Sequence, residues 1–255
     1  MRAELNRLRR IAATGVAFAV FGVGGALIGL LYFPLLLLLE RRPAQRSRHA
    51  RGVVRWVFSA FIGLMRRLGL ISYRIEGQSR LDRSGLLILA NHPTLIDVVF
   101  LISMVRNADC VVRAGLASNP FTFGPVRACD YVRNNEGPDL LQSCMDSLRQ
   151  GANLVIFPEG TRSKPGQALQ LQRGAAQIAA RAPCNVTPVH IHCWPPGLSK
   201  GQPWWRVADR PLHFSIVVGE DIAIAPFLDA AAQEPGLAAR SLTAHLAKYF
   251  SKQGE

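Results

Sequence analysis

The chain has few acidic residues, and one long stretch carries no charge of either sign. Its 17 Asp and Glu are set against 30 Lys and Arg, which gives a net charge of +13. Residues 1–80 hold 14 arginines and 3 acidic residues, so nearly all of the excess lies there. From Ile11 to Leu39, 29 successive residues are uncharged, more than the ~20 that an α-helix needs to cross a bilayer. We therefore expect residues 1–70 to form membrane-associated amino-terminal helices with a basic linker.

A cleaved signal peptide is the alternative for this stretch. Its apolar region would be about half as long and would end at small residues, whereas Leu35 to Leu39 runs directly into Glu40-Arg41-Arg42. Six arginines follow between residues 41 and 55, against four before the stretch. The positive-inside rule then favours a domain at the cytoplasmic face of the membrane.

The arginine-rich linker lacks interleaved aromatic residues and any groove-reading element. These absences argue against a nucleic-acid partner and favour anionic lipid headgroups as the counter-charge. Residues 53–70 then form an apolar helix with arginines near both ends. It is compatible with a helix in the plane of the headgroups and equally with a core helix packed on the domain.

The five cysteines include no C-x-x-C pair, and their number is odd. We interpret them as reduced thiols, which fits a cytosol-facing domain and argues against a disulfide scaffold. From residue 71 the pattern alternates between short β-type runs and helical stretches, which predicts an α/β domain over 71–255. The predicted strands are 72–76, 86–90, 110–113, 153–157, 186–192 and 213–218. The predicted helices are 93–105, 138–150, 174–182 and 238–250.

Two polar residues follow the second predicted strand at a spacing that suits a catalytic pair. The segment reads Asn91-His92-Pro93-Thr94-Leu95-Ile96-Asp97. With Pro93 at a first helical position, His92 lies outside the helix and can fold back onto Asp97. A carboxylate on one imidazole nitrogen leaves the other free to take a proton from an alcohol. The alternative is plain helix capping.

No G-x-S-x-G motif occurs in the chain. A nucleophilic serine elbow is therefore not indicated, and the activated hydroxyl would belong to the substrate.

A second polar segment follows the fourth predicted strand. It reads Phe157-Pro158-Glu159-Gly160-Thr161-Arg162-Ser163 and places a carboxylate and an arginine where a strand meets a loop, as sites in α/β domains commonly do. A turn held by a Glu159–Arg162 pair is the structural alternative.

The chain resembles the lysophosphatidate acyltransferase family of glycerolipid acyltransferases in two ordered motifs. The first is Asn-His-x-x-x-x-Asp, and the second, Phe-Pro-Glu-Gly-Thr-Arg-Ser, starts 65 residues after His92. Phe123-Gly124-Pro125 to Arg133 resembles its second block, and Val186-Thr187-Pro188-Val189 its fourth. The likeness covers roughly residues 70–220 and implies a mixed central sheet flanked by helices. Arg127 to Asp130 departs from the often apolar second block of relatives, which leaves the acceptor open.

The resemblance implies His92 as general base and Asp97 as its orienting carboxylate. It implies substrate contacts from Arg133, Glu159, Gly160, Thr161, Arg162 and Pro188. The reaction would transfer a fatty acyl group from acyl-CoA or acyl carrier protein, as donor substrate, to a lyso-lipid hydroxyl. It calls for no cofactor and no metal. Lysophosphatidate and lyso-ornithine lipid are both acceptors within the family.

Other interpretations of the chain stay open. His190 and His192 share a strand face as metal ligands often do, although a structural role is favoured. A lipid-binding protein without catalysis and a thioester hydrolase are the alternative functions. Trp194 to Trp205 forms an aromatic loop that suits either a bilayer interface or a packed surface.

Overall fold

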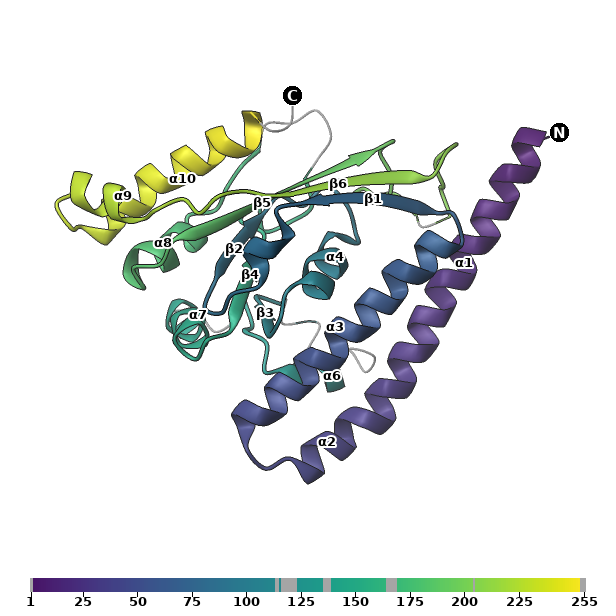
Figure 1. Cartoon of the computed structure of the whole chain (residues 1–255), viewed down its shortest axis with the longest axis horizontal. Coiled ribbons are helices and arrows are strands. Elements are labelled where there is room, and N and C mark those ends of the chain that lie inside the picture. The colour runs from purple at the N-terminus through teal and green to yellow at the C-terminus, as the bar shows by residue number, and fades with distance from the viewer. Residues whose placement is uncertain are drawn as a thin grey trace.

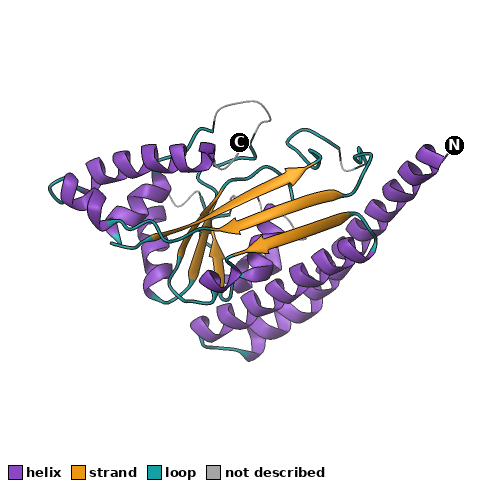
Figure 2. Cartoon of the chain, turned by 45° about the horizontal axis from the view of Figure 1, so that its top comes forward, coloured by secondary structure: helices purple, strands orange, loops and turns teal. Residues whose placement is uncertain are grey.

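A mixed six-stranded sheet forms the centre of the molecule in a computed structural model that describes residues 2–112, 115, 123–134, 139–163, 169–203 and 205–252. The strand order is β1-β6-β5-β2-β4-β3, and every pair is parallel except β5 with β6 (Figures 1 and 2). The strands are β1 Ile71–Glu76, β2 Leu87–Ala90, β3 Ala108–Cys110, β4 Asn153–Ile156, β5 Val186–Trp194 and β6 Leu212–Val218. Five of the six predicted strands are confirmed to within two residues at either end. The third, predicted for 110–113, was misplaced: β3 ends at Cys110, Val112 forms an isolated bridge, and residue 113 lies outside the described residues.

Helices cover both faces of this sheet, because alternate residues of its central strands point to opposite sides. Ile88 and Ala90 of β2 belong to one core, and Leu87 and Leu89 to the other. The first core is covered by α3, Pro43–Arg67, α4, Asp97–Met104, and α6, Phe123–Cys129. The second is covered by α7, Asp139–Arg149, α8, Gly174–Arg181, α9, Ala225–Ala230, and α10, Pro235–Lys252 (Figure 1). A 3-10 turn, Gln78–Leu81, follows β1.

Three of the four helix predictions are confirmed to within a few residues, and residue 138 of one lies outside the described residues. The prediction for 93–105 was wrong at its start, because α4 begins only at Asp97. The short helices α6 and α9 have seven and six residues. That is too short for the 3.6-residue apolar period to appear in the sequence.

The amino-terminal helix runs from Arg2 to Leu39 as α1, Arg2–Leu27, a π-helical segment, Ile28–Tyr32, and α2, Phe33–Leu39. At 1.5 Å per residue it is about 57 Å long. Residues Glu4–Leu39 are long and apolar enough to cross a membrane, and 11% of the most apolar window is buried. After a turn, α3 runs back alongside this helix, with Phe18 and Phe21 packed on Phe61 (Figure 1).

Helix α3 contains the predicted apolar helix, for which a core helix and a helix in the plane of the headgroups were both open. Its buried face, which includes Val54, Phe61 and Met65, belongs to the core under the sheet, so α3 is a core helix of the domain. Its other side carries Trp56, which is 67% exposed. Because Trp56 points outward, contact of this helix with lipid headgroups stays a prediction.

The π-helical segment packs closely against α6. A Cβ atom placed on Gly124 would lie 3.0 Å from the carbonyl oxygen of Gly29. A Cβ on Gly25 would meet nothing within 4 Å among the described residues. Gly124 therefore lets α6 approach the backbone of the amino-terminal helix at Gly29, where a side chain on residue 124 would have to displace a carbonyl oxygen.

Candidate active site

Two loops meet where β2 and β4 end. The strands are parallel neighbours, so their carboxyl ends lie at the same edge of the sheet, where sites in open α/β sheets form. His92 follows β2 by two residues, and Glu159 follows β4 by three. The two polar segments found in the sequence are thereby brought together.

The structure pairs His92 with Asp97. The Nδ1 atom of His92 lies 2.9 Å from Oδ2 of Asp97. Pro93 is not a first helical residue; residues 93–96 form a loop, and Asp97 is the first residue of α4. The predicted fold-back of His92 onto Asp97 is present, but a four-residue loop produces it rather than the mouth of a helix.

Asp97 is held by Thr94 as well as by His92. The Thr94 backbone N–H donates to Oδ2 over 2.6 Å, and its hydroxyl donates to Oδ1 over 2.5 Å. Asp97 has no exposed surface, and this burial raises its pKa, while the hydrogen bonds from His92 and Thr94 oppose the rise. The sequence reasoning missed Thr94, although Thr-x-x-Asp is the spacing of a capping box and could have revealed it.

The imidazole of His92 is stacked on Phe157, with ring centroids 4.3 Å apart. Glu159 fixes the backbone beside it, since one carboxylate oxygen accepts from the His92 N–H over 2.9 Å and from the Ser163 hydroxyl over 2.8 Å. The Ser163 N–H in turn donates to the His92 carbonyl over 2.7 Å. The second polar segment thus binds both backbone groups of His92, its N–H and its carbonyl. Phe157 and Ser163 lie inside the predicted motif but had been given no role.

Arg162 and Thr161 contact a third loop, at residues 198–200. Nη1 of Arg162 donates to the carbonyls of Leu198 and Ser199 over 3.1 and 3.2 Å, and Lys200 donates to the Thr161 hydroxyl over 2.8 Å. The loop that carries Thr94 also contacts this third loop, because the Leu95 N–H donates to the same Leu198 carbonyl. The structural alternative, a turn held by a Glu159–Arg162 pair, is not supported, because the two side chains bond to different loops.

Gly160 has a φ of +66°, a conformation that glycine adopts without strain. It lets the chain turn sharply between Glu159 and Thr161. Asn91, just before His92, bonds both backbone groups of Ile191 through its buried amide. The end of β2 is therefore fixed to β5.

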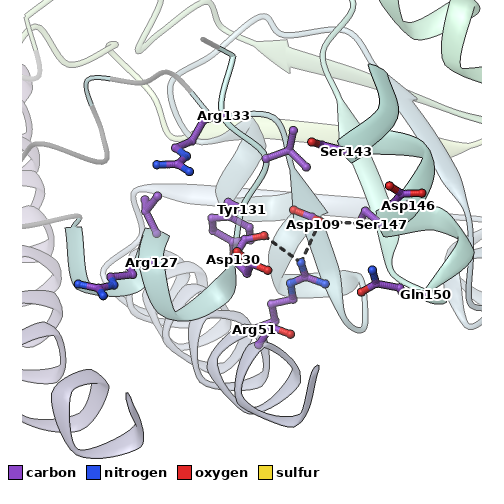
Figure 3. A pocket seen from close by; sticks show the side chains of 13 residues that line it. Arg51, Asp109, Arg127, Asp130, Tyr131, Arg133, Ser143, Asp146, Ser147 and Gln150 are labelled. Atoms are coloured by element: carbon purple, nitrogen blue, oxygen red, sulfur yellow. Dashed lines mark hydrogen bonds and ion pairs between the residues drawn. The ribbon is translucent and has the colours of Figure 1, made fainter. Parts of the chain in front are cut away.

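Arg133 lies further along the same edge of the sheet. It forms a parallel bridge with Val112, two residues beyond β3. Three strand spacings of about 4.8 Å separate this bridge from β2, so Arg133 stands roughly 14 Å from it along the edge. Arg133 lines a pocket of about 580 Å³ whose lining does not include His92 (Figure 3).

Pro188 is not brought to His92. It is the third residue of β5, in register with Leu89, and its ring and the Tyr249 hydroxyl both lie against Gly219 under α10. His190 and His192 follow on the same strand. Burial and the neighbouring His192 lower the pKa of His190 to about 4.

Residues 72–192 match the family model described as Acyltransferase. These residues therefore form an acyltransferase domain. It is 30% identical over 127 residues to the 1-acyl-sn-glycerol-3-phosphate acyltransferase of Helicobacter pylori, and 27% identical over 183 residues to that of Pseudomonas aeruginosa. The matches cover 47% and 68% of this chain, and 54% and 68% of those relatives.

A chloroplastic 1-acyl-sn-glycerol-3-phosphate acyltransferase of Arabidopsis thaliana is 29% identical over 46% of this chain, and the match spans 35% of that relative. The fold resembles the crystal structure of the 1-acyl-sn-glycerophosphate acyltransferase PlsC from Thermotoga maritima. That comparison has a TM-score of 0.68 at 20% identity and covers 86% of this chain and 87% of the other. The expected mixed sheet with flanking helices is confirmed.

Proposed function

We propose that this acyltransferase moves a fatty acyl group from acyl-CoA or acyl carrier protein to the hydroxyl of a lyso-lipid such as lysophosphatidate. The observation that carries the proposal is the 2.9 Å contact between Nδ1 of His92 and the fully buried Asp97. With Nδ1–H donated to a carboxylate, Nε2 is the basic nitrogen. The relatives named as 1-acyl-sn-glycerol-3-phosphate acyltransferases support lysophosphatidate as the acceptor.

In the proposed reaction, Nε2 of His92 takes the proton of the acceptor hydroxyl as its oxygen attacks the thioester carbonyl carbon. The resulting tetrahedral intermediate expels the thiolate as the C–S bond breaks, and the imidazolium returns the proton to that sulfur. Asp97 keeps the imidazole in the required tautomer and stabilises its charged form, as the carboxylate of a serine-type triad does. No covalent enzyme intermediate is required.

We propose Arg133, Gly160, Thr161 and Arg162 as the acceptor-contacting set. A guanidinium suits a phosphate or carboxylate headgroup. Glu159 contributes chiefly by holding the loop at His92, since its described bonds are to His92 and Ser163. Pro188, near the start of β5, stays a prediction from the resemblance alone.

The proposed site of action is a membrane surface, at the cytoplasmic face. The exposed apolar side chains of the amino-terminal helix include Val20, Leu30 and Leu38, each more than half exposed. Burying them in lipid removes a large apolar area from water. A lyso-lipid acceptor would reach the enzyme from the same bilayer.

The test uses full-length protein in vesicles or detergent, labelled acyl-CoA or acyl carrier protein, and a panel of lyso-lipids that includes lysophosphatidate and lyso-ornithine lipid. Loss of a general base should lower kcat by about 10²–10⁴-fold in His92→Ala. The matched control is His192→Ala, which removes an exposed imidazole from β5 and should leave turnover unchanged.

Undiminished transfer by His92→Ala would refute the mechanism. Free fatty acid formed without any acceptor would indicate a hydrolase. Lyso-lipid binding with no turnover by either donor would indicate a lipid-binding protein.

A further inference from the structure

Arg51 of α3 points into the domain rather than toward solvent or lipid. It is 7% exposed, and its guanidinium donates to four oxygen atoms in two separate segments. These are Oδ2 of Asp109 at 2.8 Å, Oδ1 of Asn107 at 3.2 Å, and the carbonyls of Cys129 and Asp130 at 3.0 and 3.4 Å. Figure 3 shows Arg51 reaching from its helix toward Asp109.

The far side of this cluster is also fixed. Asp109, in β3, is 1% exposed and accepts from the Ser147 hydroxyl of α7 over 2.5 Å and from the Cys110 N–H over 2.8 Å. The Arg51 cluster, defined as Arg51, Asn107, Asp109 and Ser147, thus joins α3, β3 and α7.

The two carbonyls that Arg51 binds begin the segment that carries Arg133. From Asp130 the chain passes to Val132, whose carbonyl accepts from the Val112 N–H over 2.8 Å, and then to the Arg133 bridge. Arg51 holds one end of this five-residue segment, and the extension of β3 holds the other. Arg51, Asp109, Ser147 and Arg133 all line the same pocket (Figure 3).

Stability alone does not account for a buried guanidinium here. The desolvation cost of a buried ion pair commonly offsets its attraction, and well-packed apolar residues of similar volume are often as stable. A planar fork with fixed donor directions instead constrains where its acceptors lie. Here those acceptors include the backbone that leads to Arg133.

We propose that Arg51 is a positioning residue for Arg133 and thereby sets the affinity for the anionic headgroup of the acceptor lyso-lipid. This rests on the proposed function, in which Arg133 binds that headgroup. Arg51 touches neither the acyl group nor the attacking hydroxyl in this proposal. Its loss should therefore weaken acceptor binding and leave the chemical step nearly intact.

The chain offers a matched control one turn along the same helix. Arg55 also projects from α3 and donates to a carbonyl of the domain, that of Ser103 in α4, over 3.2 Å. Arg51→Met and Arg55→Met each remove a guanidinium that ties α3 to the domain, but only Arg51 contacts the segment before Arg133.

Kinetics with lysophosphatidate and with monoacylglycerol, which lacks the phosphate, separate the two roles. Arg51→Met should raise KM for lysophosphatidate about 10–100-fold, the range for loss of a charged hydrogen-bonding group, with kcat and the KM for the acyl donor within about threefold. Its KM for monoacylglycerol should not change, and Arg51→Lys should recover part of the loss. Arg55→Met should leave the preference for lysophosphatidate unaltered.

Two further variants keep the test decisive. Arg51→Met with Asp109→Leu leaves no uncompensated buried charge, so it should fold and show the same rise in KM. Arg133→Ala should show that rise too, and the Arg51→Met/Arg133→Ala pair should be far from additive, because one change abolishes what the other positions.

An equal fall in kcat for both acceptors, or the same phenotype in Arg55→Met, would overturn the inference. Equilibrium binding of lysophosphatidate, measured on the same variants, distinguishes this failure from that of the proposed function. If the wild-type chain binds but transfers nothing, the function fails while Arg51 is still tested by affinity. If it neither binds nor transfers, both proposals fail.

Discussion

Asp97 and Asp109 are both buried acidic residues with a cationic or basic partner, yet their surroundings differ in kind. Asp97 faces an imidazole five residues earlier in the chain, whereas Asp109 faces a guanidinium 58 residues earlier. Imidazole changes charge near neutral pH, and guanidinium never does. The first pair can therefore exchange a proton with a substrate, and the second can only hold geometry.

The largest expected effect tests the first half of this comparison. Asp97→Asn keeps the shape and the bond from the Thr94 hydroxyl, but an NH2 group facing Nδ1 of His92 favours the wrong imidazole tautomer and loses the bond from the Thr94 N–H. We expect kcat to fall by about 10³–10⁴-fold, as in a serine-type triad, with a modest loss of thermal stability from the one bond. Steady-state kinetics together with a melting curve check both parts; a large drop in stability would make Asp97 a structural residue.

The second prediction concerns the other aspartate. Asp109→Ala leaves the Arg51 guanidinium buried without its carboxylate, so we expect a loss of about 3–5 kcal/mol in the free energy of unfolding. Denaturant titration in detergent measures it. If Asp109→Ala impaired turnover at unchanged stability, the contrast between a proton-exchanging pair and a geometric one would break down.

His190, in β5, is a third buried titratable group. Burial and His192 lower its pKa to about 4, from an ordinary value of 6.5. Because its folded-state pKa is depressed, the neutral form stabilises the fold above pH 6.5, and this stabilisation is lost as the pH falls toward 4. The full difference is ~3 kcal/mol.

The checking measurement is unfolding of the wild type and of His190→Gln at pH 7 and pH 5. The variant should lose less stability than the wild type across that interval. Equal losses in the two proteins would mean that His190 does not titrate with folding.

The smallest expected effect is that of Thr94→Val. It removes the hydroxyl that donates to Asp97 but keeps the backbone N–H donor. Losing a donor to the charged form raises the pKa of Asp97, so the acid limb of the kcat profile should move to higher pH, and kcat should fall about tenfold. Thr243→Val, which removes a hydroxyl bond within α10, is the control and should leave the profile in place.

The sequence was informative where the signal was local. Five of the six strands and the pairing of His92 with Asp97 follow from short runs and a five-residue spacing. The start of α4 was misplaced because a proline fits the first turn of a helix and a loop equally well, and Pro93 lies in the loop that carries Thr94. The second polar segment was placed correctly beside His92, yet its bonds to residues 198–200 depend on a chain reversal that no local pattern encodes.

Arg51 illustrates the limit more sharply. It was grouped with the linker arginines expected at lipid headgroups, and its burial depends on partners at residues 107, 109, 129 and 130. A weak local signal existed, since Arg51 stands three residues before buried Val54 and so shares its helix face. The net charge of the linker does not distinguish an arginine on the buried helix face from one at the surface.

The contact between Gly29 and Gly124 has a practical consequence for work with this protein. Ala17 and Phe33 of the amino-terminal helix lie in the same core as Phe100 of α4 and Phe214 of β6. Exchanging residues 1–39 for another membrane helix of equal hydropathy would remove Ala17 and Phe33 from that core and alter the close approach of the helix to Gly124. The choice of amino acids in this helix is therefore constrained by fit to its own domain as much as by the lipid around it.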